Sequence, residues 1–112
     1  MDDLYLQQQT QIKQLTRSLK ELRHSGTARA EAERKYKILL RQESLKLRDE
    51  GMAIGMIDKC VYGIPAVAEA RFNRDMADVV YKANMEAINV LKLNLKLIEN
   101  QISREWNKGE AI

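Results

Sequence analysis

The sequence predicts an all-α fold: a long helical hairpin, antiparallel and resembling a coiled coil, that associates into a dimeric helical bundle. Charged residues make up 31% of the 112 residues, aromatic residues make up 5%, and there is 1 Pro, a composition that favours long helices over strands. Apolar residues also recur at helical spacings on both sides of one glycine-rich segment. A chain of this length fits one domain, so we expect a single helical domain over residues 1–112.

Residues 1–50 are predicted to form the first helix, with an apolar seam along one side. The seam consists of Tyr5, Ile12, Leu15, Leu19, Leu22, Tyr36, Leu40 and Leu47. In the middle the same register falls on Gly26, Arg29 and Glu33. Either a continuous helix carries one polar interruption, or Ser25 caps a second helix after a break near residues 25–27. Because the register is preserved across this segment, we favour a kinked but nearly continuous helix.

Residues 51–64 are predicted to form the hinge at which the chain reverses. The residues that permit the reversal are Gly51, Gly55, Gly63 and Pro65. A short helix within residues 52–61 is expected to cross the top of the hairpin. Its inward-facing residues would be Met52, Ile54, Met56, Ile57 and Val61.

Residues 65–107 are predicted to form the second helix, because Pro65 suits a first helical turn and no further Gly or Pro occurs before Gly109. Its main apolar stripe consists of Phe72, Met76, Val80, Ala83 or Asn84, Ala87, Leu91, Leu95, Ile98, Ile102 and Trp106. Residues 91–98, LKLNLKLI, alternate as a half-buried strand would. No turn residue separates them from the helical pattern on either side, so we predict that they are helical.

A second apolar stripe lies beside the first on the same helix. It consists of Val79, Ala83, Val90, Leu93 and Leu97. One partner helix covers one stripe, so two stripes indicate more than one neighbour. We therefore expect these residues to mediate self-association into a homodimer.

The charge of the chain is unevenly distributed. The net charge is +3, but residues 12–48 carry 11 Lys or Arg against 4 Glu. We expect a basic ridge on the first helix, formed by Lys13, Arg17, Lys20, Arg34, Lys37, Arg41 and Arg48. Such a ridge could bind the acidic surface of a protein or the phosphates of a nucleic acid, although no aromatic residues alternate with the cations to stack on bases.

No set of side chains indicates catalysis or a metal site. The chain has 1 His and 1 Cys, and His24 and Cys60 lie in different predicted elements. The acidic residues of the second helix have Lys or Arg nearby, as on a solvated helical face. We predict that the protein is not an enzyme and has no catalytic residues, no metal and no cofactor.

The sequence also suggests a compartment. A single Cys cannot close an intrachain disulfide, which favours a reducing interior. The start of the chain lacks the pattern of a signal peptide, and no apolar run approaches the roughly 20 residues of a membrane span. We expect a cytoplasmic protein that does not contact membranes.

Residues 71–106, RFNRDMADVVYKANMEAINVLKLNLKLIENQISREW, follow the segment LRDEGMAIGMI. The second half of the chain resembles small proteins of unassigned activity encoded by phages and prophages of Gram-positive bacteria, often in early gene regions concerned with replication and recombination. The resemblance includes the Arg-Asp-Met-Ala start and the Glu-Trp close and contains no catalytic motif. It implies the cytoplasm of an infected or lysogenic bacterial host.

From these observations we expect a phage-encoded interaction protein that binds and modulates or inhibits a larger host or phage protein. Anti-defence inhibitors of the anti-CRISPR type form one such class. One alternative is a nucleic-acid-binding accessory protein in phage replication or recombination. A second alternative is a structural coiled-coil component.

Overall fold

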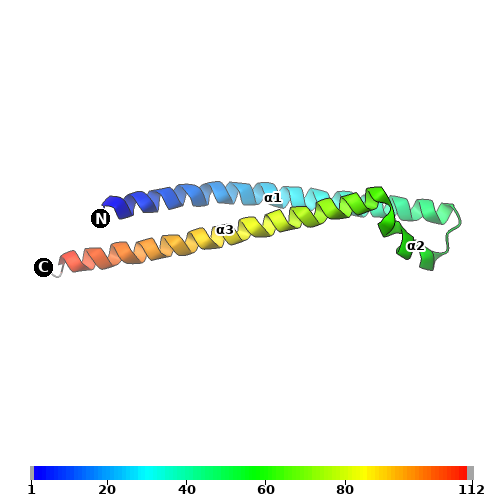
Figure 1. Ribbon diagram of the computed structural model, residues 1–112. Coiled ribbons are helices and arrows are strands. Elements are labelled where there is room, and N and C mark those ends of the chain that lie inside the picture. Colours follow the sequence, from blue (N-terminus) through cyan, green and yellow to red (C-terminus); the bar gives the residue numbers. More distant parts are fainter. Residues whose placement is uncertain (1, 111–112) are drawn as a thin grey trace. The chain divides into compact units, whose positions relative to one another are not determined.

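The computed structural model describes residues 2–110, which form an all-α helical hairpin (Figure 1). Its elements are α1 (Asp2–Asp49), α2 (Ile54–Cys60), the 3₁₀ helix η1 (Val61–Gly63) and α3 (Pro65–Glu110). Residues 91–98 are helical, and none of the described residues belongs to a strand. The predicted all-α helical hairpin is confirmed, whereas the dimeric bundle stays a prediction. The alternating apolar pattern of residues 91–98 does not produce a strand.

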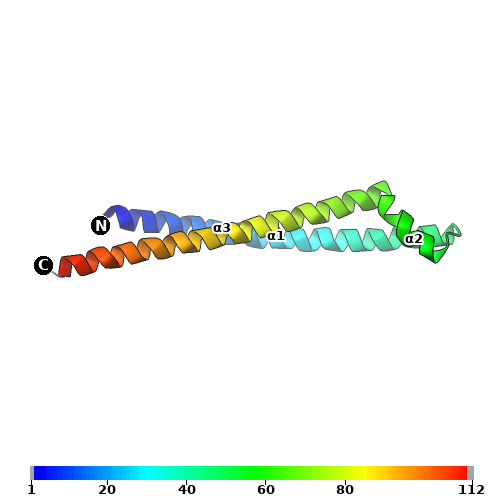
Figure 2. The same cartoon turned by 60° about the horizontal axis from the view of Figure 1, so that its bottom comes forward.

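The two long helices pair within two compact units. Unit 1 contains the described part of residues 1–24 and 82–112, and unit 2 contains Ser25–Tyr81. In unit 1 the amide of Asn84 donates a hydrogen bond of 3.4 Å to the carbonyl oxygen of Glu21, which links α3 to α1. In unit 2 the α2–η1 segment joins the end of α1 to the start of α3 and folds back against them (Figure 2).

Helix α1 runs without a break through Ser25 and Gly26. The interpretation in which Ser25 caps a second helix is therefore wrong. Ser25 is instead buried, and the ring of Tyr81 would lie 3.5 Å from a Cβ atom added at Gly26. The ring of Tyr81 thus lies beside Gly26, at an ordinary contact distance from such a Cβ atom.

Helix α1 ends at a glycine that the backbone requires. Gly51 has a φ of +91°, the left-handed region that residues with a Cβ avoid. The Gly51 N–H donates to the carbonyl of Arg48 and the Met52 N–H to that of Leu47, both at 3.0 Å, which is the Schellman arrangement. The predicted hinge glycines Gly55 and Gly63 lie inside α2 and η1 without a positive φ, so the prediction that they permit the reversal is wrong.

A small core closes unit 2. Its buried residues are Tyr36, Ile57, Val61 and Val67. The partly buried residues around it are Leu39, Leu40, Leu47, Met52, Ile64 and Ala70. The core thus combines side chains from α1, α2, η1 and α3, and the α2–η1 segment supplies two of its buried members.

The prediction that Ile54 and Met56 face inward is wrong. Ile54 is 72% exposed and Met56 is 49% exposed, whereas Ile57 and Val61 are buried. Helix α2 has only 7 residues and one face against the core. Ile57 and Val61 lie four positions apart and occupy that face.

Helix α3 begins at Pro65, as predicted, and extends to Glu110, beyond the predicted end at residue 107. Its inward side in unit 1 includes Asn84, Ile88, Leu91, Leu95, Ile98 and Ile102, which are buried or half-buried. This part of the predicted main stripe is confirmed from Leu91 to Ile102. Trp106, predicted to continue the stripe, is 60% exposed.

The main stripe is wrong in the first half of α3. Phe72, Met76 and Val80, with Ala83 and Ala87 farther along, are exposed. The inward positions are taken by Ala70, Arg74, Ala77, Asp78 and Tyr81. Charged and aromatic groups can lie inward here because partners on α1 satisfy them, a possibility that a count of apolar residues does not detect.

The seam of α1 in unit 1 also differs from the prediction. Leu15 and Leu22 are half-buried as expected, but Tyr5, Ile12 and Leu19 are exposed. The remaining inward positions are Leu4, Gln8, Gln11 and Ser18. Leu4, Gln11 and Ser18 directly precede the predicted residues Tyr5, Ile12 and Leu19, and Gln8 lies about one turn from Leu4. Two adjacent rows of the helix therefore have the same spacing, and spacing alone does not show which of them faces inward.

Candidate functional site

The predicted basic ridge lies on exposed positions of α1. All seven of its residues are exposed: Lys13, Arg17, Lys20, Arg34, Lys37, Arg41 and Arg48. The first three belong to unit 1 and the other four to unit 2. The ridge therefore supplies one candidate surface in each unit.

Three arginines of unit 2 form a regular row. Arg34, Arg41 and Arg48 recur every seven residues, so their Cα atoms are separated by about 10.5 Å along the axis of α1. Buried Tyr36 lies two residues after Arg34, which places the row on the far side of the helix from the core. These arginines form no ion pair with any residue in the described range 2–110. We call Arg34, Arg41 and Arg48 the arginine row.

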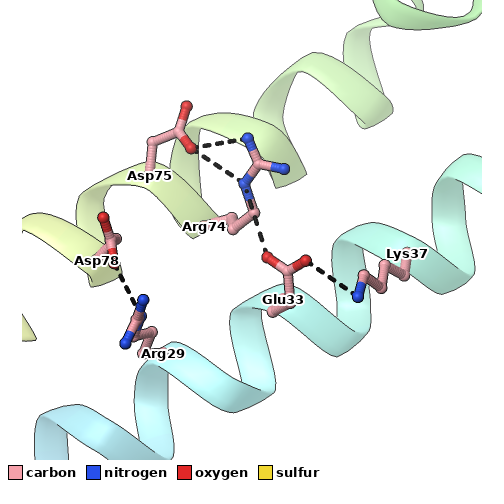
Figure 3. A network of polar contacts seen from close by, with 6 residues as sticks. All are labelled: Arg29, Glu33, Lys37, Arg74, Asp75 and Asp78. Carbon is pink, nitrogen blue, oxygen red and sulfur yellow. Dashed lines mark hydrogen bonds and ion pairs between the residues drawn. The ribbon is translucent and has the colours of Figure 1, made fainter.

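Several charged residues of unit 2 outside the arginine row form a network between α1 and α3 (Figure 3). Arg29 Nε lies 2.8 Å from Asp78 Oδ1, and Arg74 Nε lies 3.8 Å from Glu33 Oε2. Lys37 Nζ lies 3.4 Å from Glu33 Oε1. Lys37, which was predicted as part of the basic ridge, thus contributes its charge to this network as well.

Two aromatic rings support the arginines of the network. The guanidinium carbon of Arg74 lies 4.4 Å from the centroid of the Tyr36 ring, and that of Arg29 lies 4.8 Å from the centroid of Tyr81. Both distances are within the range of cation–π attraction. Each arginine therefore contacts an aromatic face as well as a carboxylate.

Arg74 contacts two carboxylates, those of Asp75 and Glu33, in addition to the ring of Tyr36. Its Nε and Nη2 atoms donate hydrogen bonds of 3.0 and 2.9 Å to Asp75 Oδ1. The pKa of Arg74 is raised, chiefly by this hydrogen bond, with further contributions from the charges of Asp75 and Glu33, while burial opposes the rise. These contacts therefore favour the charged form of the guanidinium.

The network lines a groove of about 630 Å³. Its lining residues are Gly26, Arg29, Ala30, Glu33, Arg74, Asp75, Asp78 and Tyr81. The lining contributes three carboxylates and two guanidinium groups, and Lys37 beside Glu33 supplies a third positive charge, so the network as a whole has no net charge with which to attract a ligand. The arginine row, in contrast, keeps its positive charge available to solvent.

The predicted self-association residues lie on the outer side of α3. Val79, Ala83, Val90, Leu93 and Leu97 are all exposed. Phe72 and Met76, which the sequence analysis placed inward, continue this row. Together we call them the outer stripe of α3: Phe72, Met76, Val79, Ala83, Val90, Leu93 and Leu97. The sequence contains a signal for this row: Phe72, Met76, Val79 and Ala83 follow alternating steps of four and three residues, which place them on one face of a helix.

The residues considered for chemistry lie apart. His24 is exposed on α1, and Cys60 is a half-buried free thiol in α2. Within the described residues, no group of three or more His, Cys, Asp or Glu side chains is arranged to hold a metal ion. No helix in the described range has an apolar stretch long enough to cross a membrane.

Comparison with known proteins does not assign the chain to a family. No protein-family model, curated protein or solved structure matches the chain. The resemblance to phage proteins therefore stays a prediction.

Proposed function

We propose that the chain is a non-enzymatic interaction protein whose arginine row binds an acidic surface of a larger protein. The observation that carries this proposal is the regular, exposed and unpaired set Arg34, Arg41 and Arg48 on one face of α1. Guanidinium groups bind carboxylates through paired hydrogen bonds, which makes a row of arginines better suited to an acidic surface than to an apolar one.

The internal network supports this assignment. Arg29 and Arg74 are held by carboxylates and aromatic rings of their own unit, so they stabilise the helix pair. Their engagement distinguishes them from the arginine row, whose three exposed guanidinium groups form no ion pair within residues 2–110 and can meet a partner. A rigid helix presents such a row in a fixed geometry, which reduces the entropy lost on binding.

The proposed effect on the partner is modulation or inhibition by occupying its surface. In the setting suggested by the resemblance to phage proteins, the partner is a host or phage protein of the bacterial cytoplasm, with an anti-CRISPR-type inhibitor as one form of this activity. This setting is part of the proposal and depends on that resemblance.

The test compares two charge reversals on the same helix. One variant carries Arg34→Glu, Arg41→Glu and Arg48→Glu; its matched control carries Lys13→Glu, Arg17→Glu and Lys20→Glu. Both alter the net charge equally. We expect the first variant to lose the proteins that the unmodified chain captures from a bacterial lysate, as quantified by mass spectrometry, while the control retains most of them. Equal capture by both variants would contradict the assignment.

The same row favours a second candidate, a nucleic-acid-binding accessory protein. Three arginines spaced along a helix could each neutralise one phosphate, and binding of this kind weakens about 40-fold between 50 and 200 mM salt for three contacts. A duplex or single-stranded oligonucleotide titrated against the protein distinguishes the candidates. Tight binding that follows this salt dependence and disappears in the arginine triple variant supports nucleic acid; no binding at low salt supports the protein partner.

A further inference from the structure

We infer that the outer stripe of α3 pairs with the same stripe of a second copy of this chain, antiparallel and centred between residues 84 and 85. This inference concerns another helix and another face than the arginine row, so it does not depend on the proposed function. The expectation of a homodimer is thereby given a surface, an orientation and a register.

The outer stripe has the spacing of a coiled-coil seam on one uninterrupted helix. Its positions follow steps of four and three residues: 72, 76, 79, 83, 86, 90, 93 and 97. Glu86 is the single charged residue in this series. Residues 72–97 extend for about 39 Å, and apolar positions sustained over three to four heptads are typical of a coiled coil.

The stripe is accessible in the single chain. The six large members of the outer stripe, all but Ala83, are 45% to 58% exposed. Six exposed apolar side chains on one face of a helix form the kind of surface that a second copy covers in a coiled coil.

The antiparallel register pairs every large apolar member of the stripe with another. Phe72 lies opposite Leu97, Met76 opposite Leu93, and Val79 opposite Val90. By two-fold symmetry each pair occurs twice. The remaining layer sets Glu86 opposite Ala83, whose small side chain leaves the carboxylate room to reach water.

The positions that flank the seam are complementary in the same register. Asp75 lies beside Lys96 of the second copy, and the side chain of Asp75 is 60% exposed. Val80 lies beside Ala87, and Asn73 beside Asn94. Flanking charges set orientation and partner choice in coiled coils. The register that pairs the large apolar residues also brings Asp75 beside Lys96, while Lys82 lies beside Asn89.

Other registers are less complementary. A parallel pair in register places Glu86 against its own copy and Asp75 beside Val80. An antiparallel pair shifted by one heptad places Met76 opposite Glu86, or in the other direction Phe72 opposite Arg104. Each alternative juxtaposes like charges or sets a charge against a large apolar side chain, whereas the preferred register sets Glu86 opposite the small Ala83.

Disulfide trapping tests the register. In a Cys60→Ala background, Val79→Cys and Val90→Cys are made as separate chains and exposed to mild oxidation. We expect the mixture to form a covalent heterodimer, because residue 79 of one copy faces residue 90 of the other, and each variant alone to remain uncross-linked. Cross-linking of either variant with itself would show a parallel pair and overturn the inference.

Sedimentation equilibrium tests the association itself. Leu93→Asp is expected to weaken dimerisation by more than about a hundredfold, because the change removes two buried leucines from each dimer. Lys96→Asp is expected to weaken it by roughly tenfold, and the added change Asp75→Lys to restore it. Circular dichroism confirms that the variants remain helical, as expected at exposed positions.

Two outcomes would overturn the second-copy assignment. One is a chain that sediments as a monomer at a concentration of hundreds of micromolar. The other is a monomeric chain that captures a different protein and loses this capture when Leu93 is changed to Asp. The outer stripe would then bind that protein and not a second copy. Because the arginine triple variant leaves the outer stripe intact, failure of the dimer and failure of the proposed function give separate results.

Discussion

Unit 1 and unit 2 use the same two helices but bury them differently. Unit 2 contains a cluster of four buried side chains, Tyr36, Ile57, Val61 and Val67, contributed by all of its elements. In unit 1 the buried apolar residues are Leu4 and Ile88, within the part of the chain that the structure describes. Two helices alone enclose little volume, whereas a third element across their ends closes a core. The α2–η1 segment makes this difference.

The seams of the units differ in chemistry as well. The seam of unit 2 is crossed by the ion pair of Arg29 with Asp78 and by the stacking of Arg74 on Tyr36. The seam of unit 1 includes Gln8, Gln11 and Ser18 and an Asn84 hydrogen bond to the backbone of α1. Polar seams fix the pairing of helices but bury less apolar area. Much of the apolar surface of α3 therefore remains on its outer side.

The largest loss of stability is expected from a substitution in the core of unit 2. Ile57→Ala should lower the free energy of unfolding by about 2–4 kcal/mol, because it leaves a cavity among buried neighbours. Ile54→Ala, three residues earlier and 72% exposed, is the control and should change it by less than about 0.5 kcal/mol. Denaturant unfolding measures both. Equal losses would show that the α2–η1 segment does not close the core.

A smaller loss of stability is expected from a core substitution in unit 1. Ile88→Ala should cost about 1–2 kcal/mol, less than Ile57→Ala, because half-buried neighbours can relax into the vacated space. Amide hydrogen exchange, which resolves the units, is the appropriate measurement. A loss at Ile88 that equals or exceeds the loss at Ile57 would mean that unit 1 is packed as tightly as unit 2.

A substitution at Gly51, after the end of α1, is also expected to lower stability. Gly51→Ala should destabilise unit 2 by about 1–2 kcal/mol, because alanine resists the left-handed backbone. Gly55→Ala is a matched control, since a Cβ atom there meets nothing within 4 Å and the φ is not positive. Thermal unfolding should separate the two variants. A neutral Gly51→Ala would imply that the end of α1 can adopt another turn.

The same substitution at Gly26 should have the opposite sign. A Cβ atom there would lie 3.5 Å from the Tyr81 ring, an ordinary contact, and alanine is the better helix former. Gly26→Ala is expected to stabilise the chain by about 0.5–1 kcal/mol and to raise the melting temperature. A lowered melting temperature would show that the approach of Tyr81 requires the absence of a Cβ atom.

The smallest effect concerns the ion pair of Arg29 with Asp78. The Arg29 and Asp78 side chains are 46% and 29% exposed, so solvent screens their attraction. A double-mutant cycle with Arg29→Met and Asp78→Asn should give a coupling of about 0.2–1 kcal/mol, decreasing as salt is added. A coupling that is insensitive to salt would instead assign the interaction to packing, including the contact of Arg29 with Tyr81.

The candidate surfaces could be located from the sequence to different extents. Arg34, Arg41 and Arg48 recur at a heptad interval, which places them on one face of α1, and their charge predicts that this face is exposed. Phe72 and Met76 could not be assigned in the same way, because α3 carries apolar residues on two sides. Arg74 and Tyr36 were likewise separated by sequence distance, and their stacking appears only when the helices are paired.

The helices, the start of α3 at Pro65 and the reversal after α1 could be predicted from the residues alone, because helix propensity, proline and glycine act on the local backbone. The tertiary structure decided which side of each helix faces inward and which residues of α2 enter the core. That choice depends on the contacts that each side chain makes with the other helix. Arg74 lies inward because it stacks on Tyr36 and pairs with Glu33, whereas Phe72 on the same helix lies outward. A pattern of apolar spacing cannot contain that information, since it describes one helix without its partner.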